Sequence, residues 1–233
     1  MNKLDVKEGD AYQLNCGSIA TVVEYRNCRD VDIVTNYGFF DTVRFDELRS
    51  GVIKDYCKPC VQGIGYLGQG DRREGVGLWR DILKRCYSER ITLKEKSYIN
   101  AIVCDEWHNF QNFSKWYKNN YVKGYQLDKD LKNPGMKVYG PDCCLFLPKD
   151  VNSFIQIQDK KSDLPIGINM STNDTVRVTM YGKKTKFFRY IKDASEYYWL
   201  EKYKKNEIYK KKYPHLSDYL TNHFIYRICY YED

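Results

Sequence analysis

The stretch from residue 125 to residue 155, YQLDKDLKNPGMKVYGPDCCLFLPKDVNSFI, constrains most strongly what this chain can fold into. It opens with a short apolar-leaning segment that ends in the charged sequence DKD at residues 128–130. Residues 133–135 are Asn, Pro and Gly, which form turns, and residues 144–147 are a short apolar run. Asp150 can cap a helix that begins near Val151. The order predicts a β-hairpin followed by a helix.

Such a hairpin and helix can bring two oxygen ligands together. Asp128 ends the first strand and Asn152 lies in the first turn of the helix. A carboxylate and an amide oxygen suit a hard cation such as Mg²⁺ or another divalent ion that keeps several waters. The alternative is that residues 128–130 form only a solvated turn.

The order of several segments resembles phage-encoded HNH/AP2 proteins of the homing-endonuclease type. An HNH core has a ββα fold that binds one metal ion. The similarity covers most of residues 63–233 and depends on the combined order of the motifs. The residues that carry it are Trp79, Ile82, Arg85, Cys86 and Tyr87, then Val103, Cys104, Glu106, Trp107, Asn109, Phe110 and Phe113, then LDKD at 127–130, VYGPDCCLFLPKDVN at 138–152 and LPIG at 164–167.

The resemblance implies roles for individual residues. Asp128 and Asn152 match the family's metal ligands, and Cys143 lies near its structural Asn. Lys129 occupies the position of the histidine base, and we expect Lys129 or Asp130 to assist catalysis. A solvated Lys is protonated near neutral pH and is a poor base. Either Lys129 stabilises phosphate charge while a water held by the ion attacks, or the fold only binds DNA.

Composition narrows the class of protein. The 233 residues carry a formal net charge of +7, which suits a polyanionic partner. No segment approaches the ~20 apolar residues of a membrane span, and the N-terminus lacks an apolar signal core. Nine scattered Cys indicate reduced thiols rather than a disulfide framework. Cys57 and Cys60 have the spacing of half a zinc site, but no second half is evident.

The chain as a whole predicts an α+β protein of four segments. We expect an SH3-like β-barrel over residues 1–62, and a Gly-rich linker over 63–75 whose glycines could otherwise form a phosphate-binding loop. The HNH-like domain is expected over residues 76–160, with apolar helical stripes at 76–87 and 106–119. An AP2-like domain, a three-stranded sheet with a helix, is expected over residues 161–233. His108 lies off its helical stripe and is expected at the surface.

The last segment contains the candidate DNA-reading strands. Val176 and Val178 alternate with polar residues and should pack on a helix that Asp193 caps. The outer face would then contact the major groove, unless it is merely a solvated face. The Lys-rich stretch 202–212 should be helical, and residues 225–232 should form a last strand. The candidate DNA-binding residues are Arg177, Thr179, Tyr181, Lys183, Lys184 and Lys186.

Three functions are compatible with these patterns. The first is a Mg²⁺-dependent phage DNA endonuclease or nickase that acts on double-stranded DNA in the cytoplasm of an infected bacterium. The second is a sequence-specific DNA-binding protein on a degenerate HNH scaffold, which the Lys at position 129 favours. The third is a phage protein that binds and modulates a host protein.

Overall fold

A computed structural model describes residues 6–92, 98–156, 163–171, 174–180 and 182–232. The chain combines helices with several small sheets, as expected for an α+β protein. It divides into two compact units, each described by itself below. The first unit holds Met1–Tyr121 with Lys137–Asp142, and the second holds Val122–Met136 with Cys143–Asp233.

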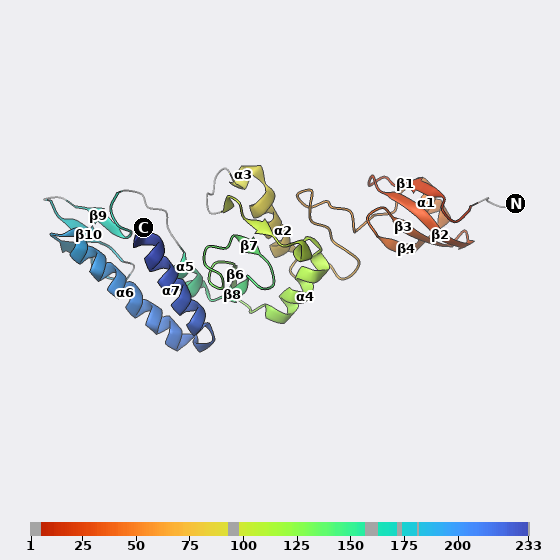
Figure 1. Cartoon of the computed structure of the whole chain (residues 1–233). Coiled ribbons are helices and arrows are strands. Elements are labelled where there is room, and N and C mark those ends of the chain that lie inside the picture. The colour runs from red at the N-terminus through yellow and green to blue at the C-terminus, as the bar shows by residue number, and fades with distance from the viewer. Residues whose placement is uncertain (1–5, 93–97, 157–162, 172–173, 181, 233) are drawn as a thin grey trace. The chain divides into compact units, whose positions relative to one another are not determined.

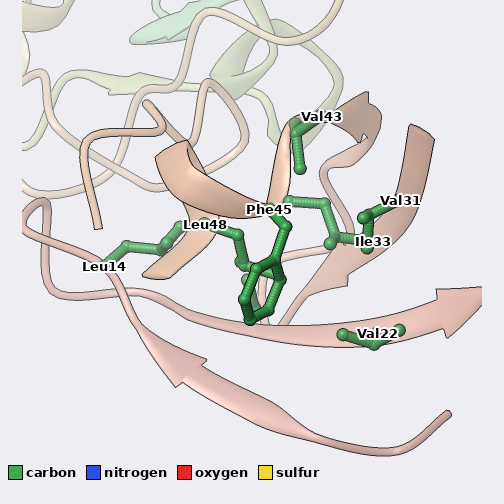
Figure 2. Packing of buried hydrophobic residues seen from close by; sticks show 8 residues of the cluster. Leu14, Val22, Val31, Ile33, Val43, Phe45 and Leu48 are labelled. Carbon is green, nitrogen blue, oxygen red and sulfur yellow. The ribbon is translucent and has the colours of Figure 1, made fainter. Parts of the chain in front are cut away.

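The first unit begins with a four-stranded antiparallel sheet in the order β1-β2-β3-β4. Residues alternate between buried and partly exposed along β3, as expected for a sheet with one covered face. Figure 2 shows the resulting core, in which two residues of helix α1 point toward the strands. The elements are β1 (Ala11–Gln13), β2 (Ile19–Asn27), β3 (Asp30–Thr35), β4 (Phe40–Val43) and α1 (Phe45–Ser50).

The expected closed barrel is a wrong prediction. Within the described part of the chain, β1 and β4 are the two edges of an open sheet and do not pair. Strand β4 is only four residues long, and the chain enters α1 directly after it. Phe45 and Leu48 of α1 are buried against Val22, Val31 and Ile33. Helix α1 therefore covers the apolar face of the sheet, which would lie inside the barrel if the sheet were closed.

The Gly-rich run at 63–75 is not a free linker, because its first half pairs with and packs on neighbouring elements. Tyr66 forms backbone hydrogen bonds with His108 and Phe110, each of 2.9 Å. A Cβ on Gly65 would collide with the side chain of Leu83. Close backbone approach explains this glycine, and no phosphate-binding role is needed.

The rest of the first unit is a small helical core. The predicted apolar stripe of the 76–87 helix is confirmed, since Trp79, Ile82, Leu83 and Cys86 are all buried. The Trp79 indole nitrogen donates a hydrogen bond of 2.7 Å to the carbonyl of Trp107. The elements are α2 (Val76–Tyr87), α3 (Glu89–Thr92), η2 (Asp105–His108), α4 (Phe110–Asn120), and the parallel pair β5 (Ile102–Val103) and β7 (Val138–Tyr139).

The second unit begins with the predicted hairpin and helix. Strands β6 (Gln126–Asp128) and β8 (Leu145–Leu147) pair antiparallel, and α5 (Lys149–Ile155) follows. Their core joins α5 to the C-terminal helices α6 (Ile191–Lys212) and α7 (Ser217–Glu232), which are connected by η3 (Pro214–Leu216) and run side by side in Figure 1. The buried residues of this core are Leu131, Leu147, Val151, Ile155, Tyr209, Leu216 and Leu220.

A three-stranded antiparallel sheet packs on the first half of α6. Its order is β11-β10-β9, formed by Lys186–Phe188, Val176–Val178 and Ile168–Met170. The predicted packing of the two valines is confirmed, because Val176 and Val178 are buried against Ala194 and Tyr198 of α6. None of the helices among the described residues has the length and apolar character needed to cross a membrane.

The predicted C-terminal strand is wrong, because residues 217–232 form helix α7. Leu220, His223, Phe224 and Arg227 are buried. Their spacing of three and four residues is helical, and packing along α6 fixes that conformation. The β-branched and aromatic residues that suggested a strand have only a weak local preference for the β conformation. Tertiary packing overrides that preference here.

Candidate metal and nucleic-acid site

The β6–β8 hairpin presents one face to α5. Gln126 pairs with Leu147, and Asp128 pairs with Leu145. Residues directly opposite each other in an antiparallel pair lie on the same face, and residues two apart on a strand do too. Leu147 is fully buried with Val151 of α5. Gln126, which is exposed, and Asp128, which is buried, therefore lie on the hairpin face that is turned toward the helix.

Asp128 is a buried carboxylate that holds the turn after β6 through hydrogen bonds. Its side chain ends the strand at 8% relative exposure. One carboxylate oxygen accepts hydrogen bonds from the backbone amides of Asp130, at 2.9 Å, and Leu131, at 2.7 Å. Burial, and then the nearby charge of Asp130, raise the pKa of Asp128 to about 6. Within the described residues, the other oxygen forms no hydrogen bond.

Asn152 reaches the same face from α5. Its amide nitrogen donates a hydrogen bond of 2.9 Å to the Gln126 side-chain oxygen. That bond leaves the amide oxygen of Asn152 available. No hydrogen bond joins Asn152 to Asp128 in the described structure. The two predicted ligands thus share one face. Gln126, two residues before Asp128 on the strand, holds Asn152 of the helix in place through their hydrogen bond.

The residues present fit a hard divalent cation. The Asp128 carboxylate, the Gln126 amide two residues before it on the strand, and the Asn152 amide bonded to Gln126 offer oxygen donors only. Gln126 was not predicted as part of the site, although its two-residue spacing from Asp128 on a strand could have indicated it. Among the described residues there is no cluster of three or more His, Cys, Asp or Glu that could hold a metal.

Lys129 and Asp130, the predicted catalytic residues, form an ion pair. The Lys129 ammonium lies 2.5 Å from a carboxylate oxygen of Asp130. Lys129 is 6% exposed, whereas the Asp130 side chain is about half exposed. Lys129 is therefore held against an acid in a buried position, which is unlike the solvated turn that was the alternative.

His108 is half-buried, and its expected surface position is wrong. Its Nε2 lies 3.1 Å from the Val103 carbonyl oxygen, and its Nδ1 lies 3.7 Å from the Asp105 carboxylate. Its ring also meets the ring of Tyr87 edge-on, with centroids 6.4 Å apart. The short η2 turn rotates His108 toward strand β5, which a continuous helix from residue 106 would not have done.

The outer face of the C-terminal sheet centres on Arg177. This residue is exposed and pairs with Asn169 on one side and Phe187 on the other. Thr179 is exposed as well, and its hydroxyl lies 3.1 Å from that of Thr185. Phe187, which is 60% exposed, was not predicted, but the alternation of β11 could have indicated it. Tyr181 lies outside the described residues.

Two of the predicted DNA-binding lysines contact the helix side of the sheet instead. Lys186 pairs with the buried Val178, and its ammonium lies 4.4 Å from the centre of the Tyr197 ring on α6. Lys183 forms an ion pair with Glu201 of α6, a residue that is buried. Lys184, in the connection between the strands, is exposed. The turn shifts the strand register so that β11 carries Lys186 on its inner face.

The comparisons name no relative. No protein-family model, curated protein or solved structure matches this chain. The chemistry of the site must therefore be inferred from its own geometry. The second unit offers a buried carboxylate and an amide on the hairpin, a second amide on α5, and an exposed basic and aromatic face on its sheet.

Proposed function

We propose that this protein is a metal-dependent phage DNA endonuclease or nickase of the HNH/AP2 type. The observation that carries the proposal is the ββα arrangement of β6, β8 and α5, with Asp128 buried on the face that is turned toward α5. The Asp128 carboxylate accepts two backbone amide hydrogen bonds through one oxygen, and we assign its second oxygen to the cation.

In this proposal each residue has a separate role. Asp128 and Asn152 hold a Mg²⁺ ion, or another divalent ion, and Gln126 orients Asn152 through their hydrogen bond. When bound, the ion polarises the scissile phosphate and stabilises the leaving oxygen. Asp130 holds the Lys129 ammonium beside the Asp128 turn, where it stabilises charge that develops on the phosphate.

Binding of double-stranded DNA is assigned to the C-terminal sheet, which we propose to be an AP2-like module. Three antiparallel strands on a long helix, with Arg177 central on the open face, support this assignment. Thr179 and Lys184 extend the same exposed region. The protein would act in the cytoplasm of the infected bacterium, where phage DNA is present.

A second candidate is a DNA-binding protein that has lost catalysis. The ion pair of the buried Lys129 with Asp130 favours it, because an ammonium held by a carboxylate does not act as a general base. This candidate predicts duplex binding that needs no metal and survives substitution of Asp128. A host protein as partner is compatible with the exposed surfaces but is favoured by no particular contact.

The test compares the wild type with Asp128→Asn on supercoiled plasmid, phage DNA and host DNA, with Mg²⁺, Mn²⁺ or EDTA. Asn can still accept the amide hydrogen bonds at the turn, so the fold should be kept while the ligand charge is lost. The matched control is Asp81→Asn, at an exposed position of α2. Nicking by wild type and Asp81→Asn but not by Asp128→Asn supports the nuclease. Metal-independent binding without nicking by any variant supports the second candidate.

A further inference from the structure

An open hollow of about 570 Å³, called the cavity below, lies on the surface of the second unit. Its walls come from the residues before β6, the first turns of α5 and the end of α6. The residues that matter for its chemistry are Lys123, Lys149, Asp150, Ser153, Lys212 and Tyr213.

The cavity has an excess of positive charge. It contains three lysines and one acid, Asp150, so its net formal charge is three minus one, or two positive charges. The Lys212 ammonium lies 2.9 Å from Asp150, and the Tyr213 hydroxyl lies 3.3 Å from it. Burial alone would raise the pKa of Asp150, but the hydrogen bonds from Lys212 and the Val151 amide outweigh it and hold that pKa below its usual range. Asp150 is thus the anchor that fixes Lys212 and Tyr213 in the wall.

The other two lysines are available to a ligand. Lys123 and Lys149 are exposed, and neither has an ion-pair partner among the described residues. Ser153, also exposed, adds a hydroxyl to the same wall. Ammonium and hydroxyl groups that converge on one hollow suit a phosphate group, whose oxygens accept several hydrogen bonds.

Helix α5 contributes residues to both the cavity and the candidate site. Lys149, Asn152 and Ser153 are three and four residues apart, so they share one face of that helix. Tyr125 lines the cavity and directly precedes Gln126, the hydrogen-bond partner of Asn152. A strand bound at Asn152 would therefore continue into the cavity.

We propose that this cavity binds a backbone phosphate of the nucleic-acid strand that lies next to the Asp128–Asn152 site, with Lys123 and Lys149 as the main contacts. The inference rests on the proposed function for its ligand. The cavity, of about 570 Å³, has room for a phosphate with its sugar.

The experiment measures the salt dependence of duplex binding in EDTA, so that cleavage cannot contribute. The variants are Lys123→Gln, Lys149→Gln and the double variant, with Lys115→Gln on an exposed position of α4 as the matched control. Each lysine that neutralises a phosphate should lower the slope of log affinity against log salt by about 0.9. The double variant should therefore lose about 1.8 from the slope, and Lys115→Gln should match the wild type.

A slope that is unchanged in the double variant overturns the proposal, whether or not the protein cleaves DNA. If the slope is reduced but the protein never nicks DNA, phosphate binding by the cavity is supported and only the nuclease proposal is refuted. Poly-glutamate serves as the second probe. If the double variant loses poly-glutamate binding while its DNA slope stays at the wild-type value, the cavity is an acidic-peptide site and the proposal fails.

Discussion

A hydrogen bond of 2.9 Å joins Asn152 of α5 to Gln126 of β6. Gln126 lies two residues before Asp128 on the same strand, so this bond ties the helix to the face that carries the buried acid. The bond is formed by side chains alone and could be removed without changing the backbone of either element.

Asp128→Asn should stabilise the protein at pH 7.5. The folded-state pKa of Asp128, about 6, is above its ordinary value of 3.8, so its stabilising contribution is present below pH 3.8 and is lost as pH rises through 6. At pH 7.5 the buried charge costs up to about 3 kcal/mol, from 1.36 kcal/mol per pKa unit. Urea unfolding at pH 7.5 should show Asp128→Asn more stable by about 1–3 kcal/mol.

Asp128→Ala is the informative companion variant. It removes the charge and also both hydrogen bonds to the amides of Asp130 and Leu131. It should therefore be less stable than Asp128→Asn by about 1–3 kcal/mol. Equal stability of the two variants would mean that these bonds contribute nothing to the turn.

Divalent ions should stabilise the wild type and should do so more strongly as pH rises from 5 to 7.5. A cation binds the ionised carboxylate, and Asp128 ionises with a pKa of about 6. Thermal unfolding with and without Mg²⁺ measures the effect. The stabilisation grows with the ratio of the Mg²⁺ concentration to the dissociation constant. Asn152→Ala should reduce the shift and Asp81→Asn should not. A Mg²⁺ shift of the same size in Asp128→Asn would exclude Asp128 as a ligand.

His223 should make the protein sensitive to acid. Burial, and then the positive charge of Arg227, lower the pKa of His223 to about 4. Its stabilising contribution is therefore full above pH 6.5 and is lost as pH falls through about 4. His223→Gln should flatten the pH dependence of the free energy of unfolding between pH 6.5 and 4. An identical slope in both proteins would show that groups other than His223 cause the acid sensitivity.

Arg177 and Lys183 should behave differently when they are replaced by Ala. Arg177→Ala should weaken duplex binding by about 1–3 kcal/mol in fluorescence anisotropy, with little effect on stability, because the side chain is exposed at the centre of the sheet. Lys183→Ala should instead lower stability by about 1 kcal/mol, since Glu201 loses one of its two lysine partners. The reverse pattern would show that the helix side of the sheet faces DNA.

Local sequence patterns predicted several elements well. The three- and four-residue spacing of Trp79, Ile82 and Cys86 predicted α2 with its correct bounds. The alternation of Val176 and Val178 predicted β10 and its packing on a helix. The turn residues of the 125–155 stretch likewise predicted the hairpin and helix that carry Asp128 and Asn152. In each case the periodicity of the side chains is a property of the segment itself.

Other features depend on contacts between distant segments, and only the tertiary structure decided them. The open N-terminal sheet depends on coverage by α1, and the helical form of residues 217–232 depends on packing against α6. The inward position of Lys186, the burial of Lys129 and the raised pKa of Asp128 likewise depend on the elements around them. The sequence by itself determined which segments are apolar on one face, because that pattern is local. The fold determined what covers each face, and hence which charges are buried and what they can bind, because burial depends on residues far apart in the chain.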